Sequence, residues 1–346
     1  MPPLHYFPLL GVCIGYTDRK GAEALETSKA VESVLNAEQL SLIRPIKVAA
    51  AKIKGKLTWG LSMLGVEKLW EQGIKGKGVR VGHLDTGVDA KHKTLKGQVK
   101  GFMEFDYAGN RVPNSKPHDS DSEGHGTHTA GTICGKSVKG LNIGVAPAAK
   151  LYSGLVIEGG EVLVRVLNGM EWCLEEKIKV LSMSLGFRGY TPFFLDLTKR
   201  LRSNGVLPVF AIGNEGPGTS RSPGNYAEAL SVGAIDSEKQ VAYFSSSITF
   251  NRPVEPQQPN VVAPGVDVIS AKPGGGVQSM DGTSMATPHV AGVAALLFQA
   301  KPDASIEQVE EAIQTTCEPP TGIPQERYGF GLVNPQKALD KLIGSR

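Results

Sequence analysis

The sequence predicts an α/β fold, a three-layer sandwich in which helices cover both faces of a mostly parallel central sheet. Apolar runs without polar alternation recur along the chain, at 79–84, 150–156, 180–185, 206–212 and 229–235. Helical patterns are clearest at 161–176, 193–203, 284–300 and 305–316. Non-alternating strands joined by helices indicate a parallel sheet that is buried on both faces. In such sheets the reacting groups lie where strands end at their carboxyl edge.

The composition is that of a globular, loop-rich enzyme. Of 346 residues, 40% are hydrophobic and 21% are charged, and the mean hydropathy is -0.12. No apolar run approaches the roughly 20 residues that span a bilayer. The net charge of +3 gives no reason to expect a nucleic-acid or membrane partner. A basic stretch at 44–56 contains no aromatic residue and is interpreted as a solvated linker.

The N-terminal region reads as a small α+β unit before a much larger one. Residues 7–15 resemble a strand, 21–35 have helical apolar spacing, and 40–46 return to strand character, which predicts a βαβ-like unit. The boundary is expected within 45–58. We assign residues 1–50 to the N-terminal unit with its linker and 51–346 to the main domain.

The cysteines and the N-terminus both suggest a cytoplasmic protein. The four cysteines are few and scattered, which predicts free thiols, at Cys13, Cys134, Cys173 and Cys317. The charges near the N-terminus follow its apolar stretch, whereas those of a signal peptide precede it. Secretion stays an alternative if the N-terminus is incomplete.

An acid and a histidine lie in two glycine-containing motifs. Asp85 is followed by Thr86 and Gly87 directly after an apolar strand, and His125 lies in the run 124–131, GHGTHTAG. Asp-Thr-Gly also marks aspartic proteases, but these need two such motifs. His125 and His128 could share a metal, but a catalytic zinc site needs a third ligand, and we find none.

A serine and an asparagine complete the set of candidates. Ser284 begins a helix of small residues, where N–H groups and the helix dipole can stabilise an oxyanion on an attacked carbonyl. An isolated serine there is usually a helix cap. Asn214 follows an apolar strand on a glycine turn, and its amide can donate to the same oxyanion. An isolated asparagine there is usually a turn residue.

Together these motifs resemble the subtilisin-like serine proteases, the subtilase family of peptidase S8 type. The resemblance rests on DTG, HGTHTAG, AIGNEG and GTSMATPHVAG and covers roughly residues 59–342. The order Asp, His, Ser differs from the orders used by chymotrypsin and by α/β-hydrolases. The resemblance implies a subtilisin-like fold and a serine endopeptidase that forms an acyl-enzyme.

The family's roles map onto matching positions. Ser284 corresponds to the nucleophile, His125 to the general base, Asp85 to the residue that orients the imidazole, and Asn214 to the oxyanion donor. His128 and His289 lie inside the motifs but off the catalytic position and are interpreted as structural. The other histidines are interpreted as solvated or packing residues: His5, His83, His92 and His118.

The resemblance also implies a cleft for an extended peptide or protein substrate. Family members pair the substrate backbone with strands on either side of the cleft. One wall corresponds to Ser184, Leu185 and Gly186, with Ala211 and Gly213 before Asn214. The second edge corresponds to Gly159, Gly160 and Glu161, where Glu161 replaces a small residue. Arg221 lies near the base of the first pocket and, if it points inward, would select an acidic side chain before the scissile bond.

No organic cofactor or catalytic metal is expected. Many relatives bind calcium in the loop after the histidine helix, but residues 136–142 carry two lysines and a valine there, so no calcium is expected in this loop. A calcium site elsewhere, for example near 119–123, stays an alternative. The N-terminal unit resembles a short inhibitory propeptide. We expect its linker to thread toward Ser284, where it is either cut by the enzyme or stays attached over the cleft.

Two alternatives to a broad degradative serine endopeptidase stay open for the function of the chain. One is a dedicated maturation or signalling protease with few substrates, and the other is a non-catalytic peptide-binding homologue.

Overall fold

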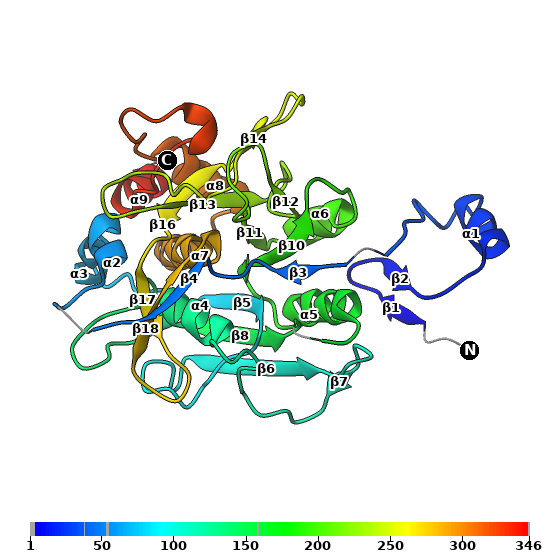
Figure 1. Cartoon of the computed structure of the whole chain (residues 1–346), viewed down its shortest axis with the longest axis horizontal. Helices are drawn as coiled ribbons and strands as arrows, with labels where there is room; N and C mark the ends of the chain where they lie inside the picture. Colours follow the sequence, from blue (N-terminus) through cyan, green and yellow to red (C-terminus); the bar gives the residue numbers. More distant parts are fainter. Residues whose placement is uncertain (1–3, 38, 53–54, 158, 345–346) are drawn as a thin grey trace.

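A central sheet organises the molecule (Figure 1). A computed structural model describes residues 4–37, 39–52, 55–157 and 159–344. The sheet has the order β16-β13-β11-β9-β5-β8-β6-β7, and all its neighbours are parallel except β6 and β7. Its strands are β5 Arg80–Asp85, β6 Val99–Phe105, β7 Arg111–Val112, β8 Lys150–Leu155, β9 Val180–Met183, β11 Leu207–Ala211, β13 Leu230–Ile235 and β16 Val261–Pro264. The predicted α/β three-layer fold is confirmed.

Helices cover both faces of this sheet. The helices are α1 Arg19–Glu26, α2 Trp59–Leu64, α3 Glu67–Glu71, α4 His125–Cys134, α5 Val162–Glu175, α6 Leu195–Ser203, α7 Thr283–Ala300, α8 Ile306–Thr315 and α9 Pro335–Gly344. One face packs on α4 and α7, and the other packs on α5 and α6. The four helices that the sequence predicted most clearly correspond to α5, α6, α7 and α8. No helix among the described residues is long and apolar enough to cross a membrane.

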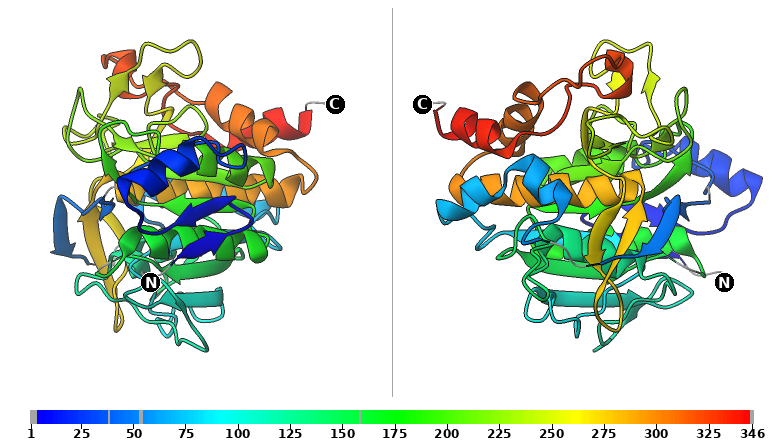
Figure 2. Two further views of the ribbon diagram at one scale, coloured as in Figure 1. Left: turned by 90° about the vertical axis from the view of Figure 1, so that its right-hand side faces the viewer. Right: turned by 60° about the vertical axis from the view of Figure 1, so that its left-hand side comes forward.

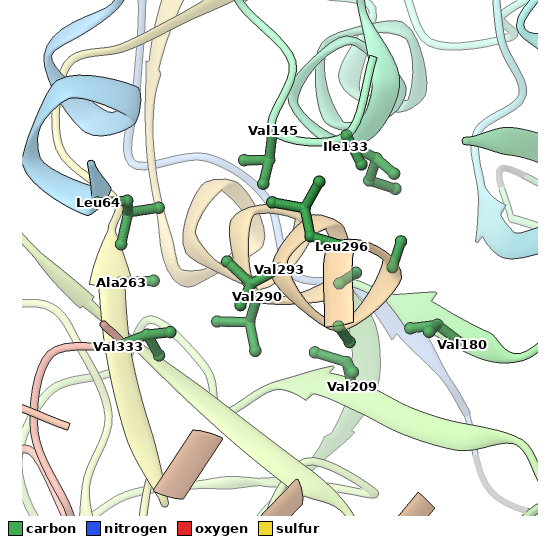
Figure 3. Packing of buried hydrophobic residues seen from close by; sticks show 14 of the residues in the cluster. Leu64, Ile133, Val145, Val180, Val209, Ala263, Val290, Val293, Leu296 and Val333 are labelled. Atoms are coloured by element: carbon green, nitrogen blue, oxygen red, sulfur yellow. The ribbon is translucent and has the colours of Figure 1, made fainter. Parts of the chain in front are cut away.

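Two apolar cores lie on the two faces. In Figure 3, Val290, Val293 and Leu296 of α7 pack over Val180 and Val209 of the sheet. The opposite core contains Leu84, Met183 and Phe210 together with α5 and α6. Alternate residues of β5 therefore enter different cores: Val81 joins the α7 side and Leu84 joins the α5 side. This alternation also fixes which face receives Asp85.

The short strands lie outside the central sheet. They are β1 His5–Phe7, β2 Val12–Ile14, β3 Ser41–Leu42, β4 Lys47–Ala50, β10 Leu185–Arg188, β12 Arg221–Ser222, β14 Ile248–Thr249, β15 Gln257–Gln258, β17 Val268–Ala271 and β18 Val277–Asp281, with a 3-10 turn at Gln325–Arg327. Two three-stranded sheets, β12-β10-β3 and β17-β18-β4, include strands from the N-terminal 50 residues. The apolar run 180–185 is thus not one strand, because the chain passes from β9 into β10 around Ser184.

The N-terminal unit differs from the predicted βαβ arrangement. Residues 7–15 form no single strand: β1 and β2 make an antiparallel hairpin, and Gly11 in its turn has a φ of 66°. The predicted helix 21–35 ends at Glu26, and Leu35 beyond it is half exposed. The unit, dark blue in Figure 2, lies against the side of the body that carries α5. Glu171 of α5 accepts hydrogen bonds from the backbone N–H groups of Leu9 and Leu10 at 2.9 and 3.0 Å.

Candidate active site

Asp85 and His125 meet where β5 ends and α4 begins. The imidazole Nδ1 lies 2.7 Å from Asp85 Oδ1, which also accepts the Thr86 backbone N–H at 2.7 Å. Both side chains are buried. The close approach requires Gly126, because a Cβ there would lie 2.1 Å from the Gly87 carbonyl oxygen. The strand end and the helix start therefore hold the imidazole against the carboxylate.

The two groups shift each other's pKa. Burial disfavours the charged Asp85 carboxylate, but the charge and hydrogen bond of His125, followed by the hydrogen bond of His83, outweigh burial and hold the pKa of Asp85 well below its usual range. Burial likewise disfavours the imidazolium, but the charge and hydrogen bond of Asp85 outweigh it and raise the pKa of His125 above 6.5. The pair thus favours an ionised carboxylate beside an imidazole that readily takes up a proton.

Ser284 is the second residue of α7, at its open N-terminal end. Pro288 has no N–H, so the carbonyl oxygen of Ser284, four residues earlier, lacks the usual helix bond. The Ser184 hydroxyl donates to that oxygen at 3.3 Å. The helix start is therefore tied to the wall that Ser184 was predicted to form.

Asn214 is held by its amide oxygen. The Thr283 backbone N–H and hydroxyl both donate to Asn214 Oδ1 at 2.9 Å. The amide nitrogen is left to point into the cleft, where it donates to the backbone carbonyl of Arg44 at 2.9 Å. Asn214 can thus donate to a carbonyl oxygen beside Ser284, as an oxyanion donor must.

The N-terminal chain itself occupies this cleft. β3 pairs antiparallel with β10, with Leu42 opposite Leu185 and Ser41 opposite Gly186, and the Ile43 N–H donates to the Ser184 carbonyl at 3.0 Å. Farther along, β4 pairs antiparallel with β18. A hollow of about 580 Å³ remains beside these residues, and its lining includes Asn214, Glu215 and Arg221 besides residues 40–46. We call residues 40–46 the cleft segment.

Two successive carbonyl groups of the cleft segment bond Ser284 and Asn214 separately. The Ser284 hydroxyl donates a short hydrogen bond to the Ile43 carbonyl oxygen. Asn214 instead contacts the carbonyl of the next residue, Arg44. His125 Nε2 has no hydrogen-bond partner among the described residues. The serine proton is therefore given to the segment and not to the imidazole.

Arg221 points inward but already has a carboxylate partner. Its guanidinium makes a short ion pair with Glu215, with side-chain exposures of 6% and 23%, and donates to Ser41 Oγ at 2.9 Å. Burial would raise the pKa of Glu215, but the hydrogen bond and charge of Arg221 outweigh it and lower that pKa. The charge that was expected to select an acidic substrate is thus balanced within the protein.

The second predicted edge does not pair with the cleft segment in the described structure. β3 hydrogen-bonds with β10 alone, Gly159 lines the cleft, and Glu161 is exposed and donates its N–H to the Tyr107 carbonyl at 2.7 Å. Gly160 cannot carry a side chain, because its φ is 69° and a Cβ would lie 2.5 Å from the Tyr107 carbonyl oxygen. Residues 159–161 therefore pack against Tyr107.

The first predicted wall of the cleft is held in place by burial and hydrogen bonding. Ala211 and Leu185 are buried, and Gly213 donates its N–H to Thr283 Oγ1 at 3.3 Å.

The buried histidines include one that lies close to the Asp85 carboxylate. His128 and His289 each bond a backbone carbonyl, and burial lowers their pKa values to about 3 and about 4. His83, by contrast, lies 3.5 Å from Asp85 Oδ2. Its position two residues before Asp85 on one strand was the available signal, because such residues share a face.

The described residues show no disulfide and no metal cluster. Cys13, Cys134, Cys173 and Cys317 are free. No three His, Cys, Asp or Glu side chains in the described part of the chain are grouped to hold a metal ion. Near the motif, Asp119 instead accepts hydrogen bonds from Thr86 and Thr127.

Comparison with known proteins agrees with the family resemblance of the four sequence motifs. The Subtilase family, Peptidase_S8, matches residues 76–331. M-protease of Shouchella clausii is 37% identical over 283 residues, which cover 81% of this chain and 69% of that protein. Subtilisin E of Bacillus subtilis is 35% identical over 287 residues, covering 81% and 70%. An alkaline protease of Shouchella clausii is 33% identical over 338 residues, covering 97% and 81%.

Proposed function

The chain belongs to the subtilase family and is a subtilisin-like serine endopeptidase, and we propose that Ser284, His125 and Asp85 carry its catalysis while its own N-terminal segment inhibits it. The observation that carries the proposal is the convergence of the cleft segment, Ser284 and Asn214. Peptide-bond hydrolysis by these side chains needs no cofactor.

The proposed reaction begins when Ser284 Oγ attacks the scissile carbonyl carbon. His125 Nε2 accepts the hydroxyl proton, and Asp85 stabilises the resulting imidazolium. The carbonyl oxygen becomes an oxyanion that accepts the Asn214 amide N–H. His125 then gives the proton to the leaving amine, which leaves an acyl-enzyme on Ser284. Water, deprotonated by His125, hydrolyses that ester and restores the serine.

Inhibition follows from the alignment of the cleft segment. The segment binds as a substrate strand would, but Asn214 holds the carbonyl of Arg44, one residue beyond the carbonyl that the serine contacts. Attack at Ile43 would therefore place the oxyanion away from its donor. This favours the version in which the segment stays attached over the cleft.

The first test is intact mass and N-terminal sequencing of wild type beside Ser284→Ala, both fresh and after incubation. We expect the N-terminus to stay whole in both. If wild type alone loses about 45 to 58 residues, the segment is a self-removed propeptide and not a lasting inhibitor.

The second test separates inhibition from catalysis through the rate of labelling by a fluorophosphonate. Ile43→Asp places a charge in a fully buried site, which is strongly unfavourable, so the segment should leave and labelling should accelerate at least about tenfold. Ile46→Asp is the matched control, because Ile46 is 45% exposed. Equal labelling of Ile43→Asp and wild type would contradict inhibition, and no labelling of either would contradict the nucleophile.

A further inference from the structure

We propose that His83 is a positioning residue for catalysis, which acts through Thr129 on the oxygen of Asp85 that His125 does not bond. The residue lies on the central strand β5, and its side chain is 1% exposed. Its hydrogen-bond partners are Ser153 and Thr129, neither of which belongs to the cleft segment. The inference rests on the proposed catalytic role of Asp85 and His125.

Three secondary-structure elements converge on His83. His83 and Asp85 are two residues apart on β5 and therefore point to the same face, the one covered by α4. Ser153 is the direct neighbour of His83 on β8, and its Oγ lies 3.0 Å from His83 Nδ1. Thr129 of α4 places its Oγ1 2.8 Å from His83 Nε2.

The chemistry of these groups orients their protons. The ionised Asp85 carboxylate only accepts, and Thr129 Oγ1 lies 3.2 Å from Asp85 Oδ2. The Thr129 proton also lies within reach of the carbonyls of His125 and Gly126, at 3.2 and 3.1 Å, but the carboxylate is the charged acceptor among them. A threonine that donates to Asp85 leaves its lone pairs for His83 Nε2–H. His83 Nδ1 is then unprotonated and accepts the Ser153 hydroxyl proton.

The resulting chain runs from Ser153 through His83 and Thr129 to Asp85. Each donor polarises the next, so that the bond to Asp85 Oδ2 is strengthened. His83 Nε2 itself lies 3.5 Å from the same oxygen. Donors on Oδ2 disperse the carboxylate charge and fix its rotation, while Oδ1 holds the imidazole. His83 thus sets both the orientation of Asp85 and the strength with which it holds the His125 proton.

The other ionisable groups around Asp85 and His125 are still present when His83 is substituted. Asp119 and Asp121 both raise the pKa of His125 by their charge, and His128 faces His125 from the same helix. Removal of the His83 donor leaves Asp85 with less dispersed charge. The pKa of His125 should therefore rise, and the acidic limb of activity should move to higher pH.

The test compares His83→Leu with His92→Leu. His92 is a matched control because it is also buried and both its ring nitrogens are hydrogen-bonded, Nδ1 with Thr94 Oγ1 and Nε2 with the Gly276 carbonyl oxygen, each at 2.8 Å. In a Ser284→Ala background, the downfield Nδ1 proton of His125 is followed by NMR as pH changes. In protein that retains Ser284, kcat, KM and the pH profile of activity are measured. The concentration of active sites is determined by fluorophosphonate labelling.

We expect His83→Leu to raise the pKa of His125 by about half a unit or more. Its kcat should fall about tenfold at the pH optimum while KM stays unchanged, because His83 bonds Ser153 and Thr129 and not the cleft segment. His92→Leu should change neither. His83→Gln, which can restore a donor to Thr129, should recover part of the loss.

Thr129→Val provides an independent variant if His83→Leu does not fold. It keeps His83 but removes the hydroxyl that contacts Asp85, so it should shift the NMR titration and the pH profile in the same direction. The proposal is overturned if the folded variants leave both unchanged, or if His92→Leu shifts them equally.

Discussion

Glu215→Gln should convert the balanced Arg221–Glu215 pair into a site for an acidic substrate side chain. The substitution keeps the shape of residue 215 and removes its charge, while the Arg221 guanidinium stays nearly buried at 6% exposure. Its Nη1 already donates to Ser41 Oγ of the cleft segment. A substrate carboxylate at the position aligned with Ser41 would then replace the missing partner.

The magnitude follows from the geometry of the pair. Two unit charges about 4 Å apart interact by about 4 kcal/mol at an effective dielectric constant of about 20. Glu215 is 23% exposed, and a substrate carboxylate must also lose water on binding. The net preference should therefore be about 1 to 2 kcal/mol, or roughly 5- to 30-fold in kcat/KM.

Internal competition between two peptides gives the cleanest assay. The peptides differ only by Asp or Asn at the position aligned with Ser41, and the ratio of their kcat/KM values does not depend on how much enzyme is free of its cleft segment. A second pair places Glu or Leu at the position aligned with Ile43, the site that the sequence assigned to Arg221. Arg221→Met in the Glu215→Gln background should abolish the gain. An unchanged Asp/Asn ratio in Glu215→Gln would refute the reasoning.

Three further predictions concern docking and pH. Glu171→Ala leaves the N–H groups of Leu9 and Leu10 without their acceptor, so limited trypsin digestion of the Ser284→Ala protein should remove the N-terminal unit faster, and Glu171→Gln should have a smaller effect. His128 and His289 have folded pKa values of about 3 and about 4 against 6.5 unfolded, so stability is complete above 6.5 and is lost as pH falls below it. Between pH 7 and pH 5, each of the two histidines should lower the free energy of unfolding, measured in urea, by about 2 kcal/mol. His289→Gln should therefore remove half of the combined loss. Because the pKa of His125 is raised, kcat/KM should decline through an acidic limb centred above pH 6.5, and a limb centred below 6.5 would contradict the Asp85–His125 coupling.

The sequence predicted the central architecture well because its main strands are continuous apolar runs and its helices are long and periodic. The strand that ends at Asp85 and the helices at 161–176 and 284–300 are each recognisable from local residues alone. The structure places the four motif residues at the ends that the pattern indicated. Local pattern and tertiary packing agree in these segments, so neither had to override the other.

The N-terminal region was harder because its structure depends on distant partners. β3 has only two residues and exists because β10 supplies its hydrogen bonds. The hairpin is held by Glu171, about 160 residues away in the chain. A single-sequence pattern contains neither contact, so the βαβ interpretation failed there. The ion pair of Arg221 with Glu215 was missed for the same reason, since orientation and not spacing decides it.

One helix and one strand together control both oxygens of Asp85. His125 and Thr129 are four residues apart on α4 and so lie on the same helix face, and each contacts a different carboxylate oxygen. β5 supplies Asp85 and, two residues earlier, His83, which bonds Thr129 from behind. The close contact of α4 with the strand end at Gly126 sets the distance between them. Any displacement of α4 would therefore move the imidazole and the second donor together, which makes the α4–β5 contact the element on which the proposed triad geometry depends.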